Sequence, residues 1–161
     1  METKIIKKSI NLQAPKEKVW DVLINDKFTR IWYAEFSEGS HADTDWKVGS
    51  KVTFTDHSMS GIVGRVIANN PYEIISVEYE GLVKDGVEDY ESKAAKNMKG
   101  GRETYRLSEM DGVTHLLVEG EGDMPSDFFE SMSGLWDKAL MKIKELSEGL
   151  QGASQPLIMT N

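Results

Sequence analysis

One long amphipathic segment, Ser126–Glu148, limits what this chain can fold into. Its apolar residues recur at helical spacing and fill an arc of roughly 140° on an α-helix. They are Phe128, Phe129, Met132, Leu135, Trp136, Ala139, Leu140, Ile143 and Leu146. Because this face is wide, aromatic and about 33 Å long at 1.5 Å per residue, it needs a sheet to cover it.

The ends of this helix are marked in the sequence. Ser126 or Asp127 can serve as the N-cap, and Asp127 forms a capping-box-like pair with Glu130. Gly149 suits the position after the last turn, where a left-handed backbone is favoured. We therefore predict one continuous helix from Ser126 to Glu148.

Length and composition narrow the class of protein. The chain has 161 residues, no cysteine and a formal net charge of −8. This length fits one domain, which we expect over residues 1–148, followed by a flexible tail over 149–161. The acidity argues against nucleic acid and against anionic membranes as partners, and no apolar run is long enough to span a membrane. We therefore expect a cytoplasmic protein.

The chain before the long helix divides into two parts. Residues 3–13 alternate as a strand, and Pro15 then suits the first turn of a helix over 16–25, followed by a second short helix over 26–36. From residue 38 to 122 the apolar period becomes two, which is typical of strands. The expected strands are residues 51–57, 61–68, 73–83, 102–110 and 113–121.

These strands predict the architecture. They are separated by short turns rich in Gly, Asn and Pro, which favour antiparallel pairing. One face of each strand is apolar and the other is polar, so the sheet is covered on one side only. The helix Ser126–Glu148 is the obvious cover. The fold class is therefore α+β.

One connection is longer than the others. Residues 84–101 (KDGVEDYESKAAKNMKGG) are charged and bounded by glycines. Loops of this length in compact domains tend to be functional. We expect a flap beside the sheet, with a short helix within residues 88–98, and we expect this segment to gate the mouth of any cavity there.

Five short motifs occur in a recognisable order. They are residues 13–20 (QAPKEKVW), 32–33 (WY), 48–51 (VGSK), 64–72 (GRVIANNPY) and 134–136 (GLW). Together they resemble the SRPBCC, or START-like, superfamily, and within it the activator of heat-shock-protein-90 ATPase homologues. The resemblance covers about residues 3–148.

The resemblance implies a helix-grip fold, in which a curved antiparallel sheet wraps around a long C-terminal helix and leaves a cavity between them. It does not imply a reaction, because the superfamily includes lipid carriers, polyketide cyclases, plant hormone receptors and co-chaperone domains. We expect no counterpart of the separate chaperone-binding domain of the eukaryotic co-chaperones in these 161 residues.

The aromatic residues are the best candidates for a site. Tyrosine and tryptophan carry a polar tip on an apolar body, which suits a pocket for a small amphipathic ligand. Dry core packing is the competing interpretation. The predicted ligand-binding residues are Trp32, Tyr33, Phe36, Phe54, Tyr79, Tyr105, Met132 and Trp136.

Residues for catalysis or metal binding are harder to find. The three histidines lack metal-site spacing, and only His57, beside Asp56, could act as a general base. The acidic residues of 84–101 lack the spacing of a calcium loop. We therefore assign no catalytic residue, metal or cofactor.

Three strand arginines leave two interpretations open. Arg65, Arg102 and Arg106 could bind a ligand carboxylate in bidentate fashion, or they could pair with Glu78 and Glu80 on the solvent face.

Three functions remain from the sequence. We favour a module that binds a small hydrophobic ligand, and a homodimer is possible. The alternatives are a cyclase-like or hydrolytic enzyme that uses His57 or a cavity tyrosine, and a co-chaperone-like protein-interaction module that uses the exposed sheet face. A continuous apolar void supports ligand binding, whereas a filled core supports protein interaction.

Overall fold

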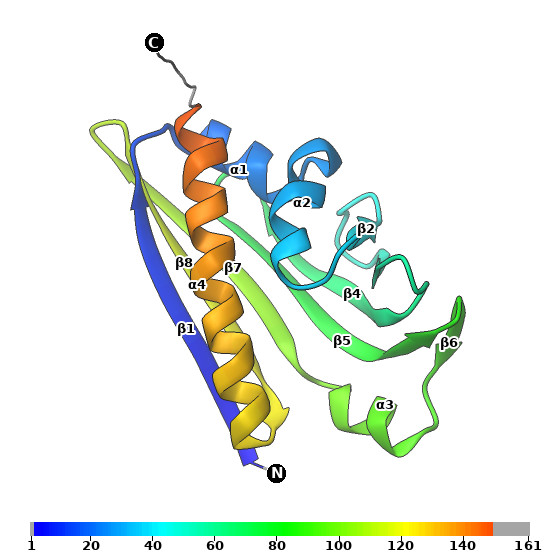
Figure 1. The fold of residues 1–161 in the computed structure, drawn as a ribbon. Helices are drawn as coiled ribbons and strands as arrows, with labels where there is room; N and C mark the ends of the chain where they lie inside the picture. Colours follow the sequence, from blue (N-terminus) through cyan, green and yellow to red (C-terminus); the bar gives the residue numbers. More distant parts are fainter. Residues whose placement is uncertain (1, 150–161) are drawn as a thin grey trace.

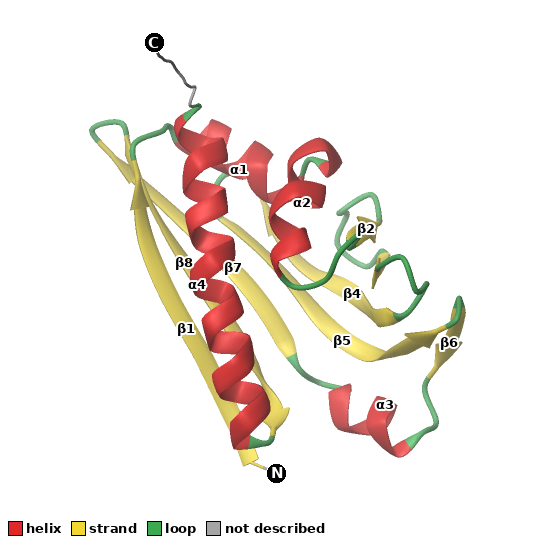
Figure 2. Cartoon of the chain, in the orientation of Figure 1, coloured by secondary structure: helices red, strands yellow, loops and turns green. Residues whose placement is uncertain are grey.

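The computed structural model describes residues 2–149 and has the predicted α+β helix-grip architecture. A long helix, α4 (Ser126–Glu148), runs across the inner face of a curved antiparallel sheet (Figure 1). Two shorter helices, α1 (Lys16–Ile24) and α2 (Asp26–Trp32), lie beside α4 over the same face (Figure 2). Among residues 2–149, no helix lies on the outer face, as the alternation of the strands predicts (Figure 2).

The sheet is antiparallel throughout. Its path runs β1-β8-β7-β5-β4-β3-β2, and β6 pairs with β5 beside it. The strands are β1 (Glu2–Leu12), β2 (His41–Asp43), β3 (Lys51–Thr55), β4 (Gly61–Asn70), β5 (Ile74–Lys84), β6 (Val87–Asp89), β7 (Arg102–Met110) and β8 (Val113–Met124). The first strand pairs along its whole length with β8, the strand that leads into α4.

The long helix has the predicted bounds, but its N-cap differs from the prediction. Pro125 occupies the N-cap position without a side-chain cap, and Asp127 accepts a hydrogen bond only from the neighbouring N–H of Phe128, at 2.9 Å. The predicted capping box is therefore wrong. Gly149 ends the helix in the left-handed conformation with φ 65°, as predicted. The buried residues of the helix lie in its middle and last turns, and they include Trp136 and Ile143.

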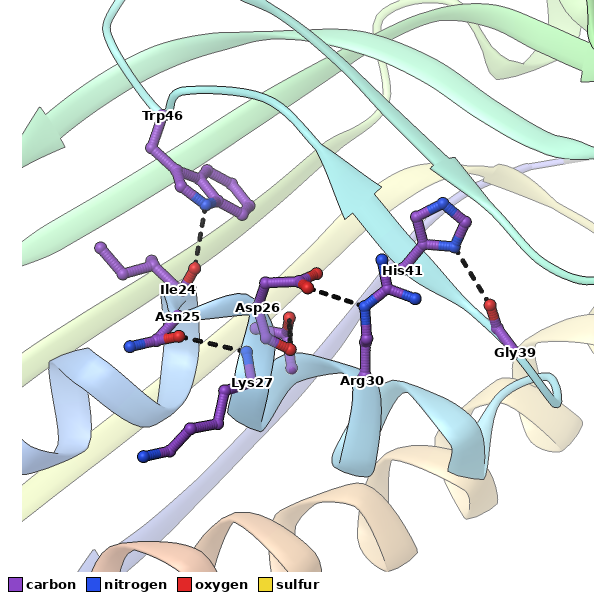
Figure 3. A network of polar contacts seen from close by, with 9 residues as sticks. Ile24, Asn25, Asp26, Lys27, Arg30, Gly39, His41 and Trp46 are labelled. Carbon is purple, nitrogen blue, oxygen red and sulfur yellow. Dashed lines mark hydrogen bonds and ion pairs between the residues drawn. The ribbon is translucent and has the colours of Figure 1, made fainter.

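Local hydrogen bonds fix the short helices over the sheet (Figure 3). Asn25 caps α2, because its side-chain oxygen accepts a hydrogen bond from the backbone N–H two residues on, at 3.1 Å. Asp26 pairs with Arg30 at 2.7 Å. The indole of Trp46 donates to the carbonyl of Ile24 at 3.1 Å, which ties the end of α1 to the sheet side. This arrangement sets where the aromatic residues after α2 project.

The segment over residues 84–101, predicted as a flap beside the sheet, contains regular secondary structure. It holds β6 and a short helix, α3 (Lys93–Met98), capped by Ser92. The predicted helix is correct for residues 93–98 and wrong for 88–89, which form a strand. Ala95 is fully buried and anchors the helix on the sheet. Of the predicted tail, residues 150–161 lie outside the described part of the chain.

Among the described residues, no helix is both long and apolar enough to cross a membrane.

Candidate functional site

A cavity of about 270 Å³ lies between the inner face of the sheet and α4. Its wall draws on α2, the short 3-10 helix η1 (Tyr33–Glu35), β3, β5, β7, β8, the region of α3 and the first half of α4. All eight residues predicted to bind a ligand lie on this wall, namely Trp32, Tyr33, Phe36, Phe54, Tyr79, Tyr105, Met132 and Trp136. Whether they bind a ligand stays a prediction.

Glycines on β8 leave room for the cavity. The inner positions of β8 are filled by Leu116 and Val118, both fully buried, and then by Gly120 and Gly122. A Cβ atom added at Gly120 would meet nothing nearer than the Cβ of Ile6, at 4.0 Å. The strand therefore stops filling the space under α4 just where the cavity lies.

Aromatic rings form one continuous side of the wall. The ring centroid of Trp32 lies 4.5 Å from that of Tyr33, 6.2 Å from Tyr105 and 6.1 Å from Trp136. Trp136 also packs on Phe36 at 4.9 Å. Most of these rings meet edge to face, the favoured geometry for aromatic pairs. The indole N–H of Trp32 donates to a backbone carbonyl of α1 at 2.9 Å, which holds the ring in place.

The sequence analysis missed the polar centre of this wall, Glu103. Its carboxylate accepts a hydrogen bond from the hydroxyl of Tyr79 at 2.7 Å, on one oxygen, and from the hydroxyl of Tyr105 on the other. On β7, Glu103 shares the inner face with Tyr105 and Leu107, both buried. The alternation that identified Tyr105 thus also pointed to Glu103.

Burial changes the acid–base properties of this centre. It raises the pKa of Glu103 above the usual 4.5, and the hydrogen bonds from Tyr105 and Tyr79 oppose that rise. The pKa values of Tyr33, Tyr79 and Tyr105 are raised well above 10, first by burial and then by the negative charge of Glu103. The three tyrosines are therefore neutral hydrogen-bonding groups rather than bases.

Polar residues also line the cavity. We call Ser37, Asp56, Ser60 and Asn97 the polar rim. Hydrogen bonds from Ser37 and Ser58 lower the pKa of Asp56 to about 2, so this carboxylate is ionised at neutral pH. Asn97 belongs to α3, and the neighbouring Met98 also lines the cavity. The end of the segment 84–101 thus borders the cavity, and its opening for a ligand stays a prediction.

The histidines lie elsewhere among the described residues. His57 is exposed and does not line the cavity, so it is not positioned to act as a general base on a molecule bound there. His41 sits 3.1 Å from the carbonyl of Gly39 through its Nδ1 atom (Figure 3). His115 is exposed on the outer face of β8 and contacts Asn11. Within the described part of the chain, no three His, Cys, Asp or Glu side chains form a group that could hold a metal ion.

The strand arginines have their partners on the outer face. Arg65 pairs with Glu80, Arg102 with Glu78 and Arg106 with Glu119, at N–O distances of 3.1, 2.9 and 3.4 Å. The sequence left open whether these arginines bind a ligand carboxylate or pair with acids on the solvent face, and the structure supports the second interpretation. Their contribution to stability is small, because exposed ion pairs are screened by water.

Glu103→Gln should change how stability depends on pH. Because the pKa of Glu103 is raised in the folded protein, the folded state keeps its proton at pH values where the unfolded state has lost it. The wild type should therefore lose stability, relative to the variant, as pH rises above about 4.5. Urea unfolding of both proteins from pH 4 to pH 8 measures this difference. Glu119→Gln, on the outer face, is the control, and a difference that stays constant or shrinks as pH rises contradicts the prediction.

Comparison with known proteins places the chain among others of this architecture. It is similar to the Aha1 dimer from Colwellia psychrerythraea, with 17% identity, a TM-score of 0.68 and coverage of 90% of this chain and 96% of that one. It is also similar to protein MLL2253 from Mesorhizobium loti (18%, TM-score 0.67, coverage 89% and 96%) and to CalU16 from Micromonospora echinospora (14%, 0.61, 93% and 87%). At these identities the likeness establishes the fold alone.

Sequence comparison adds a relative and a family. The chain is 26% identical over 118 residues to the kinesin-like protein KIN-14Q of Oryza sativa subsp. japonica, which covers 73% of this chain but only 12% of that much longer protein. The profile of the family described as "Activator of Hsp90 ATPase homolog 1-like protein" matches residues 13–148. The chain therefore belongs to the Activator of Hsp90 ATPase homolog 1-like family of the SRPBCC superfamily.

Proposed function

We propose that this protein binds a small hydrophobic or amphipathic ligand in the cavity between the sheet and α4. The observation that carries the proposal is the cavity itself, because a domain of this fold that served only as an interaction surface would need no void of about 270 Å³. The wall is mostly apolar and aromatic, with a few polar groups that converge on it, as in small-molecule sites.

The alternatives have less support. An enzyme based on His57 lacks its base in the cavity, and Tyr79 and Tyr105 already donate their hydroxyl protons to Glu103. The exposed sheet face, which an interaction module would use, carries ion pairs such as that of Arg65 with Glu80, and exposed ion pairs contribute little to affinity.

The proposal is tested in two steps. Native mass spectrometry of the protein purified from its own host should detect a co-purified small molecule, and the same spectra should report the homodimer that the Colwellia Aha1 dimer suggests. Calorimetric titration of the emptied protein with 1-naphthalenemethanol, a neutral aromatic probe, should give saturable binding with a negative heat-capacity change. If neither a native ligand nor the probe binds, the proposed function is wrong. We also propose a cytoplasmic location, which fractionation of the host would measure.

A further inference from the structure

The chemistry of the cavity wall narrows the class of ligand. We propose that the ligand is a hydrophobic amine, bound as its ammonium cation, with the nitrogen at the Glu103 carboxylate and the apolar body among the aromatic rings. The inference rests on the ligand-binding function proposed above. Three features of the wall carry it, namely an acid without a counter-ion, aromatic rings around it and a second carboxylate on the rim.

The first feature is the charge of Glu103. Within the described residues, no Lys, Arg or His side chain makes an ion pair with it, and it accepts hydrogen bonds from the neutral hydroxyls of Tyr79 and Tyr105. A carboxylate has about four acceptor positions, so two remain for a ligand. An ionised acid in an apolar cavity is costly unless a cation pairs with it.

The single basic residue on the described cavity wall does not supply that cation. Arg102 lines the cavity, but its guanidinium donates to Glu78 on the neighbouring strand, at 3.0 Å from Nε and 2.9 Å from Nη2. Arg102 and Glu103 are consecutive on β7, so their side chains point to opposite faces of the sheet. The described cavity wall therefore supplies no cation to Glu103, and a ligand cation could take that place.

The second feature is the set of aromatic rings. A cation is attracted to the face of an aromatic ring, and cages of several rings recognise ammonium groups in this way. Trp32 and Tyr33 meet at 87°, and Phe36 and Trp136 at 70°, so neighbouring rings of the wall stand at steep angles to one another. Tyr105 belongs both to this set, 6.0 Å from Trp136, and to the hydrogen bonds of Glu103.

The third feature is the polar rim. Asp56 lines the cavity and is ionised, because the hydroxyls of Ser37 and Ser58 donate to it. Two carboxylates that line one cavity attract a cation and repel an anion such as a fatty acid. The net charge of −8 acts in the same direction at longer range.

Three probes with one ring system and different charges test the inference. The first is 1-naphthylmethylamine, which is a cation at neutral pH. The second is 1-naphthalenemethanol, a neutral molecule of nearly the same shape, and the third is the anion 1-naphthaleneacetate. Calorimetric titration of the wild type at pH 7 and low ionic strength should give affinity for the amine about tenfold higher than for the alcohol, because the bond to Glu103 becomes charge-assisted. The anion should bind most weakly.

Glu103→Gln identifies the group responsible. The variant should lose about tenfold in affinity for the amine and change little for the alcohol, whereas Glu119→Gln, on the outer face of β8, should leave both unchanged. Circular dichroism establishes that each variant is folded. If Glu103→Gln does not fold, the order of the three probes on the wild type decides by itself.

Each other outcome overturns the inference in a distinguishable way. Equal binding of amine and alcohol, tighter binding of the anion, or an amine preference that survives Glu103→Gln rules out the ammonium site but leaves cavity binding intact. Failure of all three probes overturns this inference, and it rules out the proposed function as well if no small molecule co-purifies with the protein.

Discussion

Trp136→Ala should lower the free energy of unfolding by about 3–5 kcal/mol, the usual loss when a large buried aromatic side chain is truncated. Trp136 is 4% exposed and lies at the centre of the ring cluster, against Phe36, Trp32 and Tyr105. Its removal takes away the contact of the middle of α4 with Tyr105 on the sheet and with Trp32 and Phe36 beside the helix. One side of the ring borders the cavity, so the loss should fall in the lower half of this range.

Urea unfolding, followed by far-ultraviolet circular dichroism, measures this loss. Met141→Ala is the matched control, because Met141 lies on the same helix but is 54% exposed, and its truncation should change stability by less than about 0.5 kcal/mol. A loss below about 1 kcal/mol for Trp136→Ala would mean that α4 does not pack on the sheet as described.

The fold was largely predictable because its main elements carry strong periodic patterns. The helix α4 has the predicted bounds, since its apolar residues recur over many turns. The short strands β2 and β6 were not predicted, because each has three residues and depends on pairing with a neighbouring strand rather than on its own pattern. The N-cap of α4 was predicted wrongly, because residue types that favour capping do not guarantee that a side chain takes that position.

The candidate site was predictable where its residues are aromatic. Trp32 and Trp136 were expected on the interior by type and spacing, and the structure brings them together at the cavity. Glu103 was missed because an acid on a strand is normally assigned to the solvent face. By alternation it shares the inner face of β7 with Tyr105 and Leu107. An acid at a position where apolar residues are expected was therefore the available signal. Such exceptions tend to mark functional positions.

Gly120→Leu should abolish or strongly weaken ligand binding without unfolding the protein. The new side chain would project from the inner face of β8 beside Glu103, its pairing partner on β7. There it would occupy volume that an aromatic ligand needs. Affinity for 1-naphthalenemethanol should fall at least about tenfold, which corresponds to about 1.4 kcal/mol. Stability should stay the same or rise by up to about 1 kcal/mol, because glycine weakens a strand interior.

Two controls separate filling of the cavity from other effects of the substitution. Gly120→Ala adds only a Cβ atom, which has 4.0 Å to its nearest neighbour, so it should retain most of the affinity. Glu119→Leu places the same new side chain one residue earlier, on the outer face of β8, and should leave binding unchanged. If Gly120→Leu is folded and still binds the probe as tightly as the wild type, the ligand occupies another part of the molecule. If it unfolds, the space beneath α4 is narrower than the glycines of β8 imply, because a well-packed interior does not accept an added leucine side chain.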